Sequence, residues 1–317
     1  MTEAIGPDAV ETGFVPGFIE TLEYRRFAEF CDSCRRYRYI GLCYGPPGVG
    51  KTLSARRYTR WDLLGTWSSS AASSVPLESL AEPTTAFYTA SVVNTPRLVA
   101  QEVEHVRKWL HTLAREPLRR EEEMALEQIR QRDRKQQDDF LLRGEWLFEP
   151  LKPLKPSYAD VAQEYSRRSR AILDPTNLIL VDEADRLKMA SLEQMRSIFD
   201  RGDIGLVLIG MPGMEKRLAR YPQFYSRIGF VHEFRTLSAS ELRRLLAQGW
   251  APPGVSLPCL DTMDGEVISA MVRITGGNFR LLSRLLTQAE RILEINGLSQ
   301  VSQAVLEAAR ESLVIGG

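Results

Sequence analysis

The chain has 317 residues, 44% of them hydrophobic and 26% charged, and its formal net charge at pH 7 is zero. This composition excludes a disordered or fibrous chain, and the length fits an α/β domain with a smaller second unit. Zero net charge supplies no overall field that favours nucleic acid. No apolar run approaches the roughly 20 residues that cross a bilayer, and the first residues lack the regions of a signal peptide, so we expect a cytoplasmic protein without a membrane partner.

Four cysteines are too few for a disulfide scaffold in a chain of this length. Cys31 and Cys34 form a C-x-x-C, but no second pair lies at the spacing of a zinc ribbon. We interpret the cysteines as reduced thiols on a helix and in the core, with metal binding or redox chemistry as the alternative.

The first predicted elements surround a glycine-rich loop. Apolar side chains at helical spacing predict a helix over 18–37, and a strand is predicted over 39–44. The next residues, Gly45-Pro-Pro-Gly-Val-Gly-Lys-Thr52, fit the pattern G-x-x-x-x-G-K-[ST], and a helix is predicted from Lys51 to about residue 61. A strand, this loop and a helix in that order indicate a phosphate-binding site. The alternative is a glycine-rich turn that ends in Lys-Thr.

In such a loop successive N–H groups point at one anion, and the helix N-terminus adds a partial positive charge. We expect Lys51 to reach the β- and γ-phosphates of a nucleotide and the Thr52 hydroxyl to ligate Mg²⁺. The expected nucleotide-binding residues are Gly45, Pro46, Pro47, Gly48, Val49, Gly50, Lys51, Thr52, Leu53 and, from the C-terminal part of the chain, Arg280.

Two segments are predicted as insertions. Residues 65–83 are rich in Ser, Ala, Thr and Pro and are expected to be exposed, ahead of a second strand over 86–93. A helix is predicted from residue 95, and the densely charged residues 116–143, with both signs mixed, predict a solvent-exposed helix. Three prolines then predict an extended passage: Pro150, Pro153 and Pro156. We interpret 114–172 as an insertion that is either a partner-docking arm or padding, and we favour the arm.

A buried strand that ends in two acids is predicted at 178–183. Parallel strands deliver carboxylates to their C-terminal edge in this way. We expect Asp182 to hold Mg²⁺, directly or through a water, and Glu183 to orient and deprotonate an attacking water. The alternative is a strand end followed by an acidic helix cap. Together with the loop, the two acids predict a nucleotidase.

Strands and helices continue to alternate, which predicts right-handed crossovers and a parallel sheet. The remaining elements of this part are a helix over 192–199, strands over 205–210 and 230–234, and a helix over 213–219. From Ser238 the pattern is wholly helical. The predicted organisation is an N-terminal extension (1–24), an α/β nucleotide-binding domain with five parallel strands (25–237) and a small all-α domain (238–317).

Two further arginines are predicted to act with Glu183. Arg280 follows Asn278, which can cap a helix, so its cation can cross a domain cleft to the γ-phosphate. The alternative is a surface arginine in a capped helix. Arg227 precedes the fifth strand, where a ring or filament could present it to the nucleotide of a neighbour as an arginine finger. Arg217 and Arg220 are rivals for that role.

Between residues 24 and 60 the chain has nine cations and two acids. Such a patch could face the phosphates of DNA, or it could be a solvated helix face or a subunit contact. The candidate DNA contacts, chosen by charge density, are Arg35, Arg36, Arg56, Arg57 and Arg60.

Taken together, the phosphate loop, Asp182-Glu183, the arginine before the fifth strand and the Gly-Asn-x-Arg of the helical part resemble the AAA+ ATPases over nearly the whole chain. Within that class, the segments 18–21, 40–52 and 210–227 look most like the TniB/TnsC group of transposition ATPases, relatives of the phage Mu B protein. The resemblance implies a helical lid after the α/β domain, and ATP and Mg²⁺ as cofactors. It also implies a regulator that oligomerises on duplex DNA, selects the target site, and recruits or activates a transposase, with a target-selection protein as a further partner.

One departure from the AAA+ pattern lies at the end of the fourth strand. These proteins usually place a polar residue there to position the lytic water, but here Gly210-Met211 stands in its place. We expect hydrolysis to be slow and switch-like, or another group to position the water. The main alternative function is an AAA+ ATPase that acts on protein partners in secretion or signalling without binding DNA. A replication initiator or loader and a scaffold that only holds ATP are further alternatives.

Overall fold

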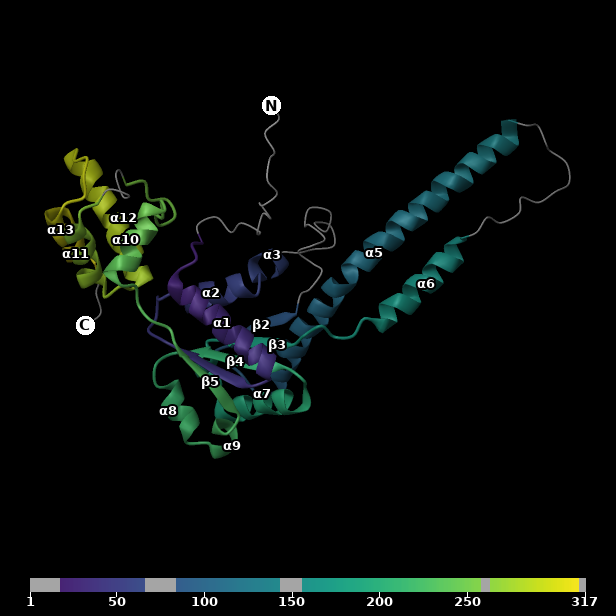
Figure 1. Cartoon of the computed structure of the whole chain (residues 1–317), viewed down its shortest axis with the longest axis horizontal. Helices are drawn as coiled ribbons and strands as arrows, with labels where there is room; N and C mark the ends of the chain where they lie inside the picture. The colour runs from purple at the N-terminus through teal and green to yellow at the C-terminus, as the bar shows by residue number, and fades with distance from the viewer. Residues whose placement is uncertain (1–17, 66–83, 143–155, 258–262, 314–317) are drawn as a thin grey trace, which may run out of the picture. The chain divides into compact units, whose positions relative to one another are not determined.

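A computed structural model of the chain describes residues 18–65, 84–142, 156–257 and 263–313 (Figure 1). By internal contacts the chain divides into two units. The first contains residues 1–66, 87–100 and 178–317, and the second contains residues 67–86 and 101–177. Most of the predicted insertion at 65–83, together with Pro150, Pro153 and Cys259, lies outside the described residues.

The centre of the first unit is a five-stranded sheet of order β2-β3-β4-β1-β5. Its strands are β1 (Ile40–Tyr44), β2 (Thr85–Thr89), β3 (Leu178–Asp182), β4 (Gly205–Gly210) and β5 (Ile228–Glu233). The pairings of β1 with β4 and β5, and of β3 with β4, are parallel. The predicted parallel α/β sheet is thus confirmed. The second strand is shorter than predicted, because the chain turns after Thr89 instead of continuing to residue 93.

Helices cover both faces of this sheet. On one face, α1 (Leu22–Tyr37) buries Phe27, Phe30 and Cys34 against Leu180 and Ile209. Leu180 of β3 pairs with Val207 of β4, and Val207 is two residues from Ile209. Since side chains two residues apart on a strand point to the same side, Leu180 and Ile209 lie on one face of the sheet. The other helices of this part are α2 (Lys51–Tyr58), α3 (Trp61–Gly65), α7 (Met189–Arg201), α8 (Met214–Ala219) and α9 (Pro222–Tyr225).

The helix after the phosphate loop is shorter than predicted. It ends at Tyr58, because the Thr59 hydroxyl donates to the Ala55 carbonyl and Arg60 takes a left-handed backbone with φ 54°. A new short helix, α3, begins at Trp61. The single helix predicted up to about residue 61 is therefore interrupted at residues 59 and 60.

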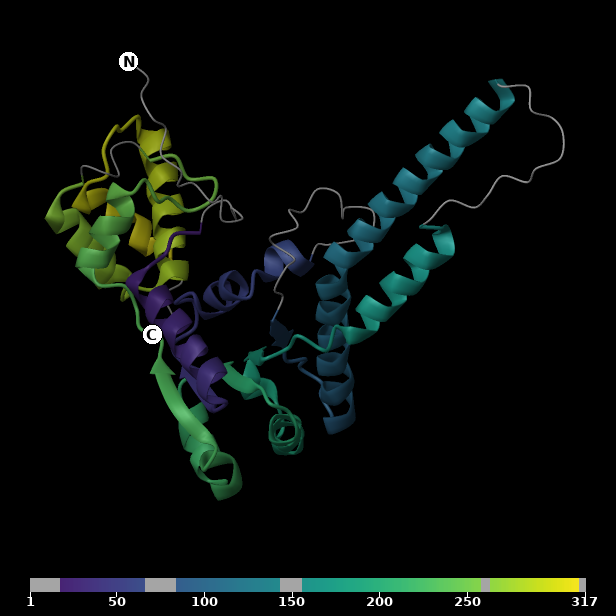
Figure 2. The ribbon, with the colours of Figure 1, turned by 45° about the vertical axis from the view of Figure 1, so that its right-hand side comes forward.

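The C-terminal part is helical, as predicted. Its helices are α10 (Ala239–Ala247), α11 (Gly265–Thr275), α12 (Phe279–Asn296) and α13 (Gln303–Glu311) (Figure 2). They gather around a leucine-rich core that includes Leu245, Met271, Leu285 and Leu306. Asn278 caps α12, because its Oδ1 accepts hydrogen bonds from the backbone N–H groups of residues 280 and 281.

The second unit is built on two helices that lie side by side, α5 (Pro96–Leu142) and α6 (Tyr158–Ala171) (Figures 1 and 2). Arg168 of α6 pairs with Glu121 of α5 at 2.8 Å, and Asp174 beyond α6 pairs with Arg107 at 2.6 Å. From the first contact to the second, the residue number rises on the α6 side and falls on the α5 side, so the two helices are antiparallel.

The helix predicted from residue 95 and the helix predicted over 116–143 form one element, α5. The helix runs through Pro117 as one element of 47 residues. A proline inside a helix removes one backbone hydrogen bond. Here the turn around it is reinforced by the buried carboxylate of Glu116, which accepts hydrogen bonds from Arg119 and Arg120.

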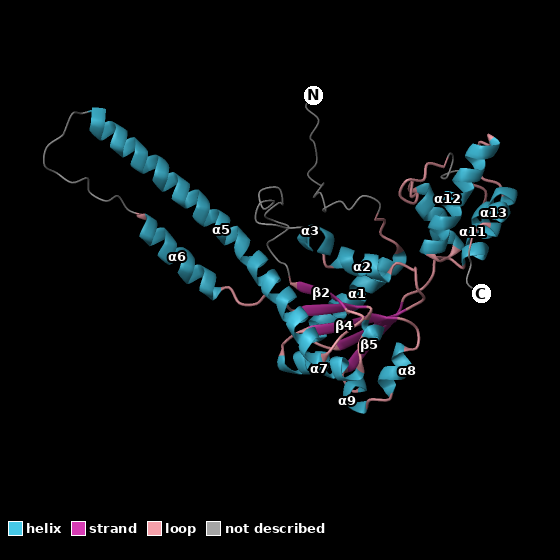
Figure 3. Cartoon of the chain, turned by 180° about the vertical axis from the view of Figure 1, so that it is seen from behind, coloured by secondary structure: helices cyan, strands magenta, loops and turns pink. Residues whose placement is uncertain are grey.

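Three thiols are buried in the described part of the first unit. Cys31 and Cys34 on α1 and Cys43 on β1 are free and fully buried. Burial raises the pKa of Cys34 to about 12 and raises the pKa of Cys31 and Cys43 as well. Within the described residues, no group of three His, Cys, Asp or Glu side chains could hold a metal ion. Figure 3 shows where the helices of these residues lie. None of these helices is long and apolar enough to cross a bilayer.

A polar pair joins α1 to the edge strand β5 within an aromatic cluster. Nε2 of His232 lies 3.1 Å from Oε1 of Glu23, and the His232 ring stacks on Phe30. Burial raises the pKa of Glu23, but the close contact with His232 and the hydrogen bond from the backbone of Arg235 outweigh burial and hold this pKa below its usual value of 4.5. The carboxylate therefore contributes stability above pH 4.5 that is lost as the pH falls through its pKa in the folded protein.

We expect Glu23→Gln to lower the free energy of unfolding by about 2 kcal/mol at pH 7, because His232 loses its charged partner in a buried position. Urea unfolding of the variant and of the wild type at pH 7 and pH 4 measures the effect, and the difference should shrink at pH 4. Glu29→Gln on the exposed side of the same helix is the matched control. A loss of equal size at both positions would refute the role of the pair.

Candidate functional site

The loop between β1 and α2 has the shape that its glycines predict. Gly48 and Gly50 take positive φ values of 81° and 106°, which residues with a side chain rarely adopt. A β-carbon at Gly48 would lie 2.6 Å from Oδ1 of Asn278 and 2.9 Å from Cβ of Arg280. Glycine is therefore required there both by the backbone and by the close approach of α12.

Lys51, the first residue of α2, folds back over this loop. Its Nζ donates to the carbonyl oxygens of Gly45 and Pro46 at 2.6 and 2.7 Å. Burial lowers the pKa of Lys51, and the nearby carboxylates of Asp182 and Asp185 oppose that shift. The ammonium thus lies over the loop that we expect to hold phosphate.

The two acids after β3 lie beside the start of α2. Asp182 is buried and accepts hydrogen bonds from the Thr52 hydroxyl and from the backbone N–H of Glu183, the latter at 3.0 Å. Burial raises the pKa of Asp182, and the Thr52 hydrogen bond opposes this. Glu183 has a left-handed backbone, and its carboxylate pairs with Arg186 in the short helix η1 (Ala184–Arg186).

The start of α12 closes over the phosphate loop. Nδ2 of Asn278 donates to the Pro47 carbonyl at 2.6 Å, and the Arg280 N–H donates to the Gly48 carbonyl at 3.2 Å. The helical part therefore contacts the loop through the Gly-Asn-x-Arg segment that the sequence singled out. Arg280 itself lines the cavity beside the loop.

A cavity of about 630 Å³ connects these groups. One side consists of the phosphate loop with Lys51, Thr52, Asp182 and Glu183. The other side is apolar and is formed by Phe18, Ile19, Trp250, Pro253 and Phe279. An anion cradle next to an aromatic wall suits a ligand that joins phosphates to a flat base.

The packing at the end of β4 explains why Gly210 stands where AAA+ ATPases usually have a polar residue. A β-carbon at Gly210 would lie 2.6 Å from Sδ of Met214 and 3.0 Å from Oδ1 of Asp185. The space that a larger residue would take is therefore filled by these two side chains. Asp185 lines the cavity and is the polar group nearest to this position among the neighbours of Gly210.

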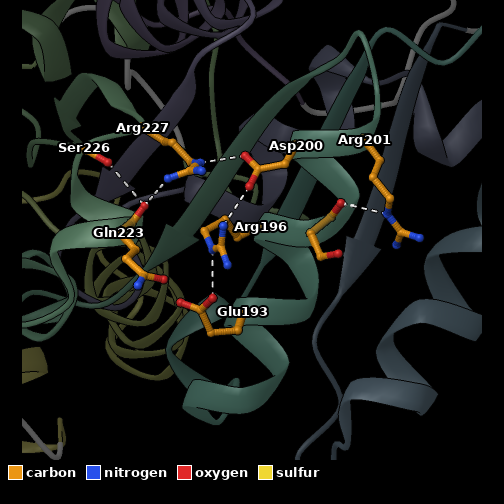
Figure 4. A network of polar contacts seen from close by, with 8 residues as sticks. Glu193, Arg196, Asp200, Arg201, Gln223, Ser226 and Arg227 are labelled. Carbon is orange, nitrogen blue, oxygen red and sulfur yellow. Dashed lines mark hydrogen bonds and ion pairs between the residues drawn. The ribbon is translucent and has the colours of Figure 1, made fainter.

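The three candidate arginine fingers do not line this cavity. Arg217 donates to the carbonyls of Asp185 and Leu187. Arg227 donates to Asp200 at 2.6 Å and to the Gln223 carbonyl, in a network that also includes Glu193 and Arg196 (Figure 4). Arg220 is exposed.

The five candidate DNA contacts differ in their surroundings. Arg35 contacts Asp32 and Tyr58, and Arg56 pairs with Asp62. Arg57 lines the cavity and lies over the Phe18 ring. Arg36 and Arg60 are exposed, and Arg36 lies over the Tyr37 ring. Arg56 is exposed as well, but of these three exposed arginines only Arg36 and Arg60 have no acidic partner in the described contacts.

Sequence reasoning missed several residues of this site. The apolar wall was not predicted, because Phe18, Trp250 and Phe279 are far apart in the chain and the motifs that contain Phe18 and Phe279 were interpreted through other residues. Asn94 and Arg186 were also missed. Asn94 has an exposed fraction of 1% and binds the backbone of the segment after Glu183. A buried asparagine cannot be recognised from its neighbours in the sequence.

Known proteins are similar to this chain over most of its length. The model of the AAA domain family matches residues 34–218, which is more than half of the chain. The chain belongs to this family. It is 41% identical over 300 residues to a "Potential ATP-binding protein" of Staphylococcus aureus, which covers 94% of this chain and 97% of the relative. The family and this relative support ATP binding by an AAA+ ATPase.

Two more distant matches are of different kinds. The chain is 29% identical over 125 residues to the Mu-like prophage FluMu DNA transposition protein B of Haemophilus influenzae, which covers 37% of this chain and 40% of that protein. Among solved structures, the ORC1 protein of Aeropyrum pernix in complex with DNA matches with a TM-score of 0.47 and 19% identity, over 95% of this chain and 68% of that chain.

Proposed function

We propose that the protein binds ATP with Mg²⁺ and hydrolyses it slowly, as a switch. The observation that carries this proposal is the hydrogen bond between Thr52 and Asp182, which brings the helix start after the phosphate loop to the acids after β3. A hydroxyl and a carboxylate are oxygen ligands of the kind that Mg²⁺ prefers. Bound there, Mg²⁺ would neutralise charge on the β- and γ-phosphates.

In the proposed reaction, Lys51 and the loop N–H groups hold the phosphates of ATP. Glu183 accepts a proton from the water that attacks the γ-phosphorus, and the bond to the ADP oxygen breaks. Arg280 contacts the γ-phosphate from the start of α12, where the Asn278 and Arg280 contacts to the loop support such a position. The residues 238–317 would then act as a lid on a nucleotide-binding domain formed by 25–237.

We also propose that the ATP-bound protein assembles on duplex DNA as a ring or filament and regulates transposition, as the TniB/TnsC group does. The similarity to the transposition protein B of Haemophilus influenzae supports this proposal, although it spans 37% of the chain. The partners would be duplex DNA, a transposase and a target-selection protein. The exposed Arg36 and Arg60 are the preferred DNA contacts among the five candidates.

DNA binding is the test of this second proposal. We expect binding to duplex DNA to be tight with a non-hydrolysable ATP analogue, weak with ADP or without nucleotide, and indifferent to sequence. A monomer without net charge has little attraction to DNA, but repeated subunits add their contacts. Because phosphate contacts release counterions, affinity should fall steeply with salt, and the change is measured by electrophoretic mobility shift from 50 to 200 mM salt.

The combined variant Arg36→Ala, Arg60→Ala should weaken this binding by about tenfold and lower the salt dependence. Arg310→Ala at an exposed position of α13 is the matched control. Binding that is equally tight without nucleotide would contradict the switch. Complete absence of DNA binding would favour the alternative, an AAA+ ATPase that acts on protein partners.

A further inference from the structure

The carboxylate proposed as the general base is not free in the structure. Glu183 pairs with Arg186, which follows it by three residues in η1. The same guanidinium donates to the Ala90 carbonyl at 3.4 Å, just beyond the end of β2. Both side chains of the pair are partly exposed, at 38% for Glu183 and 40% for Arg186, so the pair is weak enough to open.

The backbone around this pair is held by other side chains. Asn94 donates to the Arg186 carbonyl at 3.0 Å, and its Oδ1 accepts a hydrogen bond from the Lys188 N–H at 3.2 Å. From the other side, Arg217 of α8 donates to the Asp185 carbonyl at 2.9 Å and to that of Leu187. The position of the segment after Glu183 therefore does not depend on the side chain of Arg186.

We propose that Arg186 is a positioning residue that restrains Glu183 and keeps the basal rate of ATP hydrolysis low. This inference rests on the proposed role of Glu183 as the base. A carboxylate oxygen that is held by a guanidinium is not available to orient water. Turnover then requires that the pair opens first. Since α8 and the loop after β2 hold the backbone, the pair opens by movement of the two side chains alone.

The test is the steady-state kinetics of Arg186→Ala in the full chain. We expect kcat to rise about threefold, because an exposed ion pair holds only a modest excess of closed over open forms. KM for ATP should stay unchanged, since the phosphates are held by Lys51 and the loop. Arg186→Lys keeps a cation beside Glu183 and should return kcat towards the low wild-type rate. Arg201→Ala, at an α7 arginine bound only to its own helix carbonyl in the described contacts, is the matched control.

Two outcomes would overturn the proposal. In the first, Arg186→Ala lowers kcat, which would mean that this arginine assists the reaction. In the second, KM rises together with kcat, which would indicate a general change of the nucleotide site. Circular dichroism and thermal unfolding of both Arg186 variants show whether either result reflects misfolding. If Arg186→Ala is misfolded, the kcat of Arg186→Lys decides, and a rate far from the wild-type value would overturn the proposal.

A double variant separates this inference from the proposed function. In a Glu183→Gln background, Arg186→Ala should have no effect on the residual rate, because the two residues act through one contact. If the rise persists in that background, Arg186 does not act through Glu183 and the inference fails. If Glu183→Gln alone leaves turnover at the wild-type rate, the base assignment fails instead.

Discussion

Lys51→Ala is expected to abolish measurable ATP binding, whereas Glu183→Gln is expected to leave ATP binding intact and stop turnover. The ammonium of Lys51 lies over the loop carbonyls of Gly45 and Pro46, where it is poised to meet the phosphates. Losing a charge-assisted contact to two phosphates should weaken binding by about 100-fold or more. The amide of Gln keeps the shape of Glu183 but cannot accept a proton, so the rate should fall by about 100-fold or more.

Isothermal titration with a non-hydrolysable ATP analogue and a phosphate-release assay separate these two effects. Lys216→Ala on the exposed side of α8 is the control for loss of a lysine, and it should change neither quantity. Equal loss of nucleotide affinity in the Lys51 and Glu183 variants would contradict the assignment of separate roles.

The sequence predicts the sheet well because each strand carries its own signal. The runs that became β1, β3 and β4 are short, apolar and bounded by loops, and their alternation with helices predicts parallel pairing. The helices predicted from residue 95 and over 116–143 form the single α5, and a proline inside a helix, such as Pro117, is tolerated only where the turn around it is stabilised. The buried contact of Glu116 with two arginines provides that stabilisation, and it depends on side chains that pattern reasoning does not place.

The phosphate loop and the two acids were found in the sequence because each is a contiguous motif. Their meeting through Thr52 and Asp182 follows from topology, since the carboxyl ends of parallel strands share one edge of the sheet. The ion pair between Glu183 and Arg186 has no such origin. It lies in an irregular segment whose carbonyls are bound by Asn94 and Arg217, and a sequence pattern does not reveal which distant side chains reach an irregular backbone.

The same limit applies to the choice among the three arginines. The sequence favoured Arg227 and left Arg217 and Arg220 as rivals, and the structure gives the three different surroundings. Arg217 is bound to backbone carbonyls beside the site of its own subunit. Its loss would therefore disturb that site directly, whatever the neighbouring subunit does. This leaves Arg227 and Arg220 as the candidates for an arginine that acts between subunits.

We expect Arg227→Ala to lower ATP turnover by about 1,000-fold while changing ATP affinity little. An arginine supplied by a neighbour meets the γ-phosphate only in the transition state of an assembled pair. In the structure Asp200 and the Gln223 carbonyl hold this guanidinium in a half-exposed position (Figure 4). Self-association should accordingly depend on ATP, and light scattering with a non-hydrolysable analogue and DNA should detect it. One unchanged monomer under those conditions would contradict assembly.

A mixing experiment tests whether Arg227 acts on a neighbour. Subunits with Lys51→Ala cannot hold ATP but still present Arg227, and subunits with Arg227→Ala hold ATP but lack the arginine. Each variant alone should be inactive, and an equal mixture should regain turnover, because one class of interface then combines an intact loop with an intact arginine. If Arg227 instead serves only the network with Asp200, then Arg227→Ala and Asp200→Ala should lower the unfolding temperature alike, and mixing should restore nothing. Recovery with Arg220→Ala in place of Arg227→Ala would transfer the role to Arg220.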